Sequence, residues 1–125
     1  MRDDYYYDEE LGYVDEEEIE KRLKILKLPM ASEYFAASVQ PPYIVYLTPS
    51  ANYYGADGVN MMRDQTFRIE LITKSKDIVL QNELFKLFSD IPFRVTEESG
   101  GQRNYYLTTV EFEQTLPIDY IDDDE

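Results

Sequence analysis

The sequence contains no histidine, no cysteine and no tryptophan among its 125 residues. Without cysteine there is no disulfide framework and no thiol chemistry. Without histidine there is no Ser-His-Asp or Cys-His triad and no Cys/His metal site. No Gly-x-Gly-x-x-Gly or Gly-Lys-Ser/Thr pattern marks a phosphate-binding loop. We therefore expect a protein that is not an enzyme, with no catalytic residues, no cofactor and no metal site.

Basic side chains are scarce, with 12 Lys and Arg against 26 Asp and Glu, for a formal net charge of −14. The excess lies at the ends, since residues 1–20 carry −9 and residues 111–125 carry −7, whereas residues 21–110 carry +2. Blocks of like charge are usually solvated tails, and docking on a basic partner surface is the alternative. Because no basic stripe faces the phosphates of a duplex, we expect no direct nucleic-acid readout.

Long uninterrupted hydrophobic runs are also missing. The charge-free stretch 34–56 is broken by Pro41, Pro42 and Pro49, so it cannot form a spanning helix. The acidic N-terminal region lacks a positive segment followed by an apolar one, so we expect no signal peptide and no membrane partner. The absence of cysteine fits the cytoplasm.

What the sequence does contain favours one folded domain, since 43% of residues are hydrophobic and 12 are tyrosine. A first helix is predicted from Glu16 to Lys27, with Asp15 as N-cap and Glu18 three residues later as in a capping box. Acids near its start and bases near its end complement the helix dipole. The bases are Lys21, Arg22, Lys24 and Lys27, and the apolar positions are Ile19, Leu23 and Leu26.

A second helix is predicted from Asp77 as N-cap to about Ser89, with an apolar stripe at helical spacing. Strands are predicted at residues 43–48, 62–73, 93–98 and 103–112, where β-branched and aromatic residues alternate or cluster. Residues 49–60 are predicted to be a long loop. Ser99 to Gln102 is a hairpin signal, because adjacent glycines adopt positive φ easily.

These elements predict an α+β fold in the order helix, strand, strand, helix, strand, strand. The expected architecture is a single four-stranded, mainly antiparallel sheet with both helices on one face. The folded domain is placed at residues 15–113. Residues 1–14 form an acidic, tyrosine-rich N-terminal tail, and residues 114–125 form an acidic C-terminal tail, both extended.

Tyrosines provide the candidate functional residues. The two adjacent tyrosines of the predicted loop Ser50–Asn60 are costly to expose, so they either fold back on their own sheet or bury on a neighbouring subunit. The run Tyr5–Tyr7 either anchors the N-terminal tail on another surface or stays solvated. The predicted interface residues are Tyr5, Tyr6, Tyr7, Asn52, Tyr53, Tyr54, Asp57, Met61, Met62 and Arg63.

Several stretches together resemble a known family. They are LPMASEYF at 28–35, PPYIVYL at 41–47, SANYYGAD at 50–57 and FRIELIT at 67–73, followed by Lys76-Asp77 and by Ile91-Pro92-Phe93 after the second helix. The pattern, over residues 18–112, resembles the small tail-completion proteins of long-tailed, non-contractile bacteriophages, which are of the tail-terminator or tail-to-head joining class. Ile72 departs from it, standing where tyrosine is expected, and the acidic ends are longer than usual.

The resemblance implies a virion structural protein at the head–tail junction. It implies a hexameric ring of this chain that caps the tail tube and joins it to the head connector. The implied partners are other copies of the chain, the tail tube protein and a head-completion or connector protein. The implied location is the virion tail and neck, after assembly in the host cytoplasm. The resemblance carries no catalytic residues, and it places the loop Ser50–Asp57 at a subunit interface.

Two alternatives remain open at this point. A head-completion adaptor ring is another small oligomeric connector of the same junction, and the sequence separates it poorly from a terminator. An acidic DNA-mimic inhibitor fits the net charge. The position of the charge argues against a mimic, because a mimic spreads acids over its folded surface.

Overall fold

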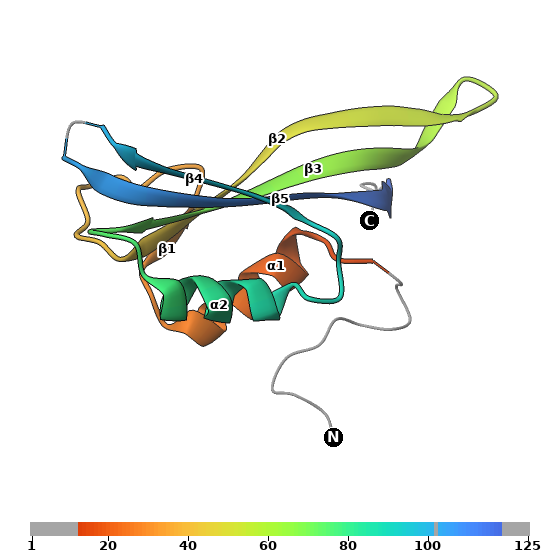
Figure 1. Cartoon of the computed structure of the whole chain (residues 1–125). Helices are drawn as coiled ribbons and strands as arrows, with labels where there is room; N and C mark the ends of the chain where they lie inside the picture. Colours follow the sequence, from red (N-terminus) through yellow and green to blue (C-terminus); the bar gives the residue numbers. More distant parts are fainter. Residues whose placement is uncertain (1–12, 102, 119–125) are drawn as a thin grey trace.

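The computed structural model describes residues 13–101 and 103–118, which form an α+β fold with one sheet and two α-helices on one of its faces (Figure 1). The α+β class predicted from the sequence is therefore confirmed. The elements in chain order are α1 (Glu16–Leu23), the 3-10 turn η1 (Lys24–Leu26), β1 (Met30–Ser32), β2 (Tyr43–Ala56), β3 (Val59–Thr73), α2 (Ile78–Leu87), β4 (Arg94–Gly100) and β5 (Tyr105–Pro117).

The predicted sheet of four mainly antiparallel strands is wrong in the number of its strands. The sheet has five strands in the order β1-β2-β3-β5-β4, and the extra strand β1 runs parallel to β2. The other neighbouring pairs are antiparallel, as expected from hairpins. β1 was missed because it has three residues, too few for an alternating pattern to show.

Both helices begin where the sequence predicts. The Asp15 carboxylate accepts a hydrogen bond from the Glu18 backbone N at 2.9 Å, and the Asp77 carboxylate accepts one from the Leu80 backbone N at 3.0 Å. These side chains satisfy backbone donors that have no partner inside the helix. The first helix is shorter than predicted, because α1 gives way to η1 and the chain turns at Lys27, where φ is +59°.

The hydrophobic core lies between the sheet and the two helices. Alternate residues of β3 and β5 point to the helices, because successive side chains of a strand face opposite sides. The buried side chains are Ile44, Phe67, Ile69, Leu71, Val110, Phe112 and Leu116 from the sheet, Ile19 and Leu23 from α1, Leu84 and Leu87 from α2, and Val14, Phe88 and Ile91 from the connections. In β2, Ile44 on the core side is fully buried, and Val45 on the other face is also buried.

Arg22 has a different position from the one predicted. The sequence places it among the bases that complement the helix dipole, but the side chain is fully buried between the two helices. Its guanidinium donates to the Asp90 carboxylate at 2.9 and 3.0 Å, to the Leu87 carbonyl at 2.9 Å and to Glu18 at 2.9 Å. It also lies over the ring of Phe88. A buried charge is tolerated only when it is paired in this way.

The predicted β4–β5 hairpin is present, but its turn lies later than the predicted residues 99–102, because Ser99 and Gly100 still pair with Tyr106 and Tyr105. Gly100 and Gly101 both adopt positive φ. β5 runs to Pro117, five residues beyond the predicted strand end, and pairs with β3 along that length. Within residues 13–101 and 103–118, no helix is long and apolar enough to cross a membrane.

Candidate interaction surface

The β2–β3 hairpin projects beyond the helices as an arm (Figure 1). We define the arm as residues 50–66, in which β2 and β3 pair from Ser50↔Thr66 to Ala56↔Val59. β5 accompanies β3 only as far as the pair Met62↔Pro117, and β1 pairs with β2 only at residues 44–46. The end of the arm is therefore a two-stranded ribbon with no third strand beside it.

The predicted loop at residues 49–60 is wrong, because most of it belongs to paired strands. The connection is a two-residue turn, Asp57-Gly58, in which φ is +56° and +76°. Asp-Gly with positive φ at both positions is the preferred turn of a two-residue hairpin. This dipeptide was the signal that could have revealed the arm. Pro49, Ser50 and Asn52 obscured it, because they are typical of loops.

Gly55 allows the strands to approach closely at an irregularity in the arm. The register of the two strands shifts between Tyr54 and Gly55. A Cβ atom placed on Gly55 would lie 1.9 Å from the Val59 backbone O and 2.7 Å from the Met61 backbone N. No side chain fits there, so the shape of the arm depends on glycine at this position.

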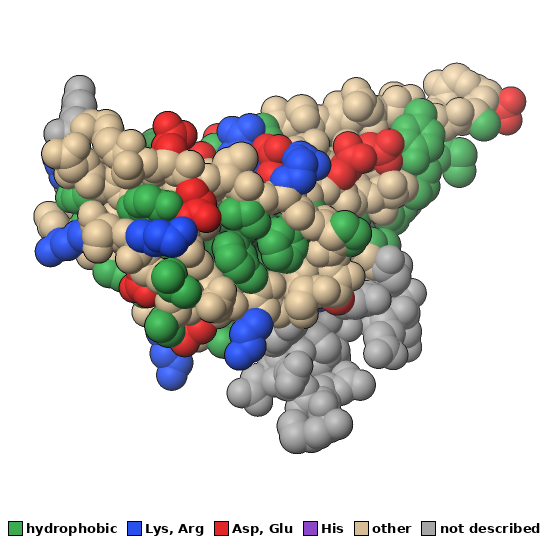
Figure 2. Space-filling model, viewed as in Figure 1, with side chains coloured by type: hydrophobic (Ala, Val, Ile, Leu, Met, Phe, Trp, Pro, Cys, Tyr) green, Lys and Arg blue, Asp and Glu red, His purple; other side chains and the backbone are tan. Residues whose placement is uncertain are grey.

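The arm carries four of the large hydrophobic side chains that remain exposed. Tyr53, Val59 and Met61 are 53%, 52% and 55% exposed, and Tyr54 is 45% exposed. Figure 2 shows hydrophobic side chains along the side of the arm that faces the helices. Scattered exposed apolar residues need no explanation, but a concentration on one projecting ribbon is typical of an interaction site.

Polar contacts hold the arm to the body at its base. The Arg63 guanidinium pairs with the Glu16 carboxylate of α1 at 3.3 Å and donates to the Gln65 side chain at 3.0 Å. On the other face of the ribbon, Asp64 accepts hydrogen bonds from the Tyr54 hydroxyl at 3.3 Å and from the Thr115 hydroxyl at 2.7 Å. The base of the arm is thus oriented, while its tip is left to solvent.

A shallow groove of about 530 Å³ lies where the arm meets the body. Tyr53 and Arg63 line it from the arm, and Tyr13 and Leu116 line it from the neighbouring segments. Tyr53 and Arg63 are cross-strand partners, so they share the face of the ribbon that looks toward α1. Because Tyr53 lines the groove and is also one of the exposed side chains of the arm, the groove adjoins the candidate surface.

The structure brings together the seven predicted interface residues that it describes. Asn52, Tyr53, Tyr54, Asp57, Met61, Met62 and Arg63 all lie on the arm or its turn. Tyr5, Tyr6 and Tyr7 lie outside the described residues. Val59 was not singled out from the sequence, since a lone valine beside a turn gives no signal until its strand is known to be uncovered.

A comparison with protein-family models finds no match, and a comparison with curated proteins finds no significant match. The candidate surface therefore rests on the geometry of the arm. That geometry suits binding to another protein: a projecting ribbon with large, half-exposed apolar side chains and few charges near its tip.

Proposed function

We propose that this chain is a structural protein of a bacteriophage virion, located at the head–tail junction. It assembles with other copies of itself into a ring, which the family resemblance makes hexameric. The ring caps the tail tube and joins it to the head connector. The observation that carries the proposal is the arm, whose exposed Tyr53, Val59 and Met61 call for a protein partner.

The position of the arm supports assembly into a ring. A ring requires a heterologous contact, in which one surface of a subunit meets a different surface of the next. The arm extends from one end of the sheet, away from the turn that joins β4 and β5 at the other end (Figure 1). In a ring, the arm of one subunit would contact a different surface of the next subunit.

The first experiment measures the assembly state of the purified full chain by native mass spectrometry. Negative-stain imaging of the chain mixed with tail tubes then shows whether tubes are capped. We expect closed rings of one size and tubes that end in a ring. A chain that stays monomeric at high concentration and never caps tubes would refute the proposal.

A substitution on the arm separates assembly from folding. Tyr54→Ala removes a ring that is about half exposed, so it should cost little in the monomer, whereas truncating a buried interface aromatic typically costs about 2 kcal/mol or more of association free energy. The matched control is Ile25→Ala, which truncates a similarly exposed side chain outside the arm. Equal losses of thermal stability and of assembly in Tyr54→Ala would mean that the arm is only structural.

A head-completion adaptor ring is the second candidate function. It is supported by the same exposed arm, and it differs from a terminator in the partner that the ring binds. Mixing the chain separately with tail tubes and with isolated head connectors distinguishes the two functions. Binding to connectors alone, in the absence of any effect on tubes, favours the adaptor.

A further inference from the structure

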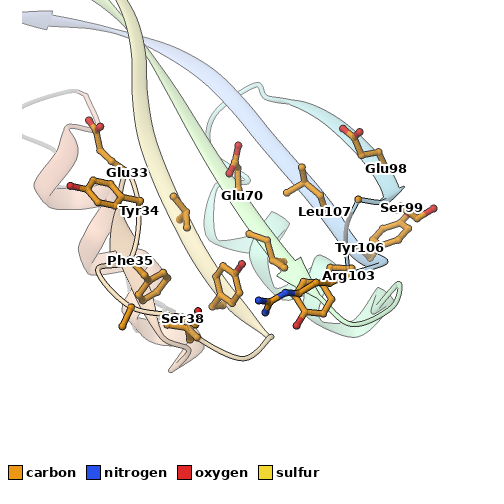
Figure 3. A pocket seen from close by; sticks show the side chains of 18 residues that line it. Glu33, Tyr34, Phe35, Ser38, Glu70, Glu98, Ser99, Arg103, Tyr106 and Leu107 are labelled. Carbon is orange, nitrogen blue, oxygen red and sulfur yellow. The ribbon is translucent and has the colours of Figure 1, made fainter.

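A trough crosses the face of the sheet that the helices leave uncovered. Its floor is formed by Val45, Glu70, Ile72 and Leu107, which come from β2, β3 and β5. One wall is the segment 33–39 between β1 and β2, with Tyr34 and Phe35, and the other is the end of the β4–β5 hairpin (Figure 3). The trough has a volume of about 690 Å³. It lies at the opposite end of β2 and β3 from the arm, so it is a separate surface.

Glu70 is the notable side chain of the floor. It is half-buried, and its register neighbours across the sheet are Val45 on β2 and Thr109 on β5. Burial raises the pKa of its carboxyl, and the charge of Arg68 offsets this only in part. Among the residues that the structure describes, none donates a hydrogen bond to this carboxylate. A partly desolvated carboxylate of this kind gains from a cationic partner.

The charges around the trough are mostly acidic. Glu33 and Glu98 stand on its two walls, and Arg103 is the one base that lines it within the described part of the chain. The two other arginines of this face are already engaged, because Glu111 accepts from Arg68 at 3.0 Å and from Arg94 at 2.7 Å. The trough therefore presents one carboxylate in an otherwise apolar floor, with an acid on each wall.

The width of the trough indicates the shape of the occupant. Three inter-strand intervals separate β2 from β4, which at about 4.8 Å each gives about 14 Å. An α-helix with its side chains is about 10–12 Å across and spans most of this width, whereas one extended strand covers less of it. A helix placed there also covers the second face of the sheet, in the manner of layered α and β folds.

We propose that the trough binds an amphipathic helix of a partner protein, with basic residues beside its apolar stripe. The stripe packs on Ile72 and Leu107, which are only partly buried, and a Lys or Arg side chain pairs with Glu70. The acidic ends of this chain have the wrong charge to occupy the trough themselves. The proposal goes beyond the ring function and does not depend on it.

The test uses a synthetic helical peptide of about five turns (~18 residues) with one Leu stripe flanked by Lys in an Ala background. It is titrated into the isotope-labelled full chain, and backbone amide shifts are followed by NMR. We expect the shifts to concentrate at the trough, around residues 45, 70, 72 and 107. A peptide with Glu in place of Lys should bind at least about tenfold more weakly, because a charged hydrogen bond is lost.

Two variants of the chain locate the contact. Glu70→Gln keeps the shape of the side chain and should weaken binding of the Lys peptide about tenfold. Glu83→Gln is the matched control, since Glu83 is an exposed acid of α2 on the other face of the sheet. Thermal unfolding of each variant checks that the fold is kept.

Three results would each overturn the proposal. They are shifts that map to the arm or the helices instead of the trough, equal affinity for the Lys and Glu peptides, and unchanged affinity in Glu70→Gln. The assignment of a helix fails separately if a proline-interrupted peptide of the same composition binds equally well. Failure of the ring proposal would leave these results unaffected, because the titration is made on the chain in its own assembly state.

Discussion

The base and the tip of the β2–β3 hairpin belong to the same two strands but lie in different surroundings. At the base, Phe67, Ile69 and Leu71 point to the helices and are almost completely buried. In the arm, Tyr53, Val59 and Met61 keep about half of their surface exposed. Neighbouring strands and helices cover the base on the core side, whereas the tip of the arm has only its own partner strand.

This difference separates residues that stabilise the monomer from residues that are free to bind. Burial contributes roughly 25 cal/mol per Å² of apolar surface removed from water. Apolar side chains of the arm stay partly exposed in the isolated chain, so much of that contribution is made only when a complex buries them. We therefore expect substitutions at the base to act on folding, and substitutions in the arm to act on association.

The largest effect is expected at the base. Phe112 packs its ring against Phe67 and Phe88, with centroid distances of 5.6 and 5.4 Å. Phe112→Ala should lower the free energy of unfolding by about 3–5 kcal/mol, because it leaves a cavity in the core. The matched change in the arm, Tyr53→Ala, should cost less than about 1 kcal/mol. Chemical denaturation of both variants measures this, and similar losses would break the comparison between base and arm.

The next effect concerns the attachment of the helices beneath the base. Arg22→Ala removes the cation that joins α1 to Asp90 and to the Leu87 carbonyl, and it should lower the free energy of unfolding by about 3 kcal/mol. Arg22→Met keeps the volume of the side chain and should cost less. Lys24→Ala serves as the control, because Lys24 is an exposed base two residues after Arg22. A loss as small as in the control would mean that the ion pairs are not needed for packing.

A smaller, local effect is expected in the arm. Gly55→Ala forces a methyl group against the Val59 carbonyl, so the ribbon must distort. Hydrogen exchange of the arm amides should speed up at least about tenfold, equivalent to about 1.4 kcal/mol of local opening. The global unfolding midpoint should stay nearly unchanged. Gly58→Asn, at a turn position where Asn tolerates positive φ, should perturb exchange less. A large drop in the midpoint for Gly55→Ala would show that arm and base unfold together.

The smallest effect is a dependence on pH at the edge of the sheet. Hydrogen bonds to Glu97 from Lys76, Tyr106 and Gln81 lower the pKa of its carboxyl from 4.5 to about 2. A depressed pKa stabilises the fold above the unfolded value, so this contribution is fully present above about pH 4.5 and is lost as the pH falls toward 2. Glu97→Gln should flatten the stability profile in that window, as followed by thermal melts at several pH values.

Glu70 provides the internal contrast for that experiment. Its pKa is raised by burial, so its ionisation opposes folding, and Glu70→Gln should increase stability at neutral pH. Changes in stability of opposite sign in Glu97→Gln and Glu70→Gln would support a stabilising carboxylate at the β4 edge and a carboxylate kept for binding in the trough. Stability changes of the same sign in both variants would contradict that distinction.

Local features of the chain were predictable because their causes are local. Asp15 and Asp77 cap helices through side-chain contacts three residues away. The alternation Phe67, Ile69 and Leu71 predicts a half-buried strand from its period alone. Most of the arm was misread, since Pro49 and Gly55 resemble loop residues, although Asp57-Gly58 carried the correct signal.

Features that join distant segments were not predictable in this way. The strand β1 is too short to show a pattern, and it exists because β2 offers an edge for its three residues. Arg22 is buried because Asp90, 68 positions later, accepts its charge. The trough arises only when β5 inserts between β3 and β4 and brings Leu107 beside Ile72.

The sequence by itself determined the class of the fold, the helix starts, the hairpins and the placement of charge at the two ends. The tertiary structure decided which strand edges were left uncovered, which base became part of the core and which carboxylate lay in the trough. The physical reason is one of scale. Propensities and caps contribute about 1 kcal/mol or less each and act within a few residues. Burial of side chains from distant segments contributes several times more, and it depends on where the whole chain places them.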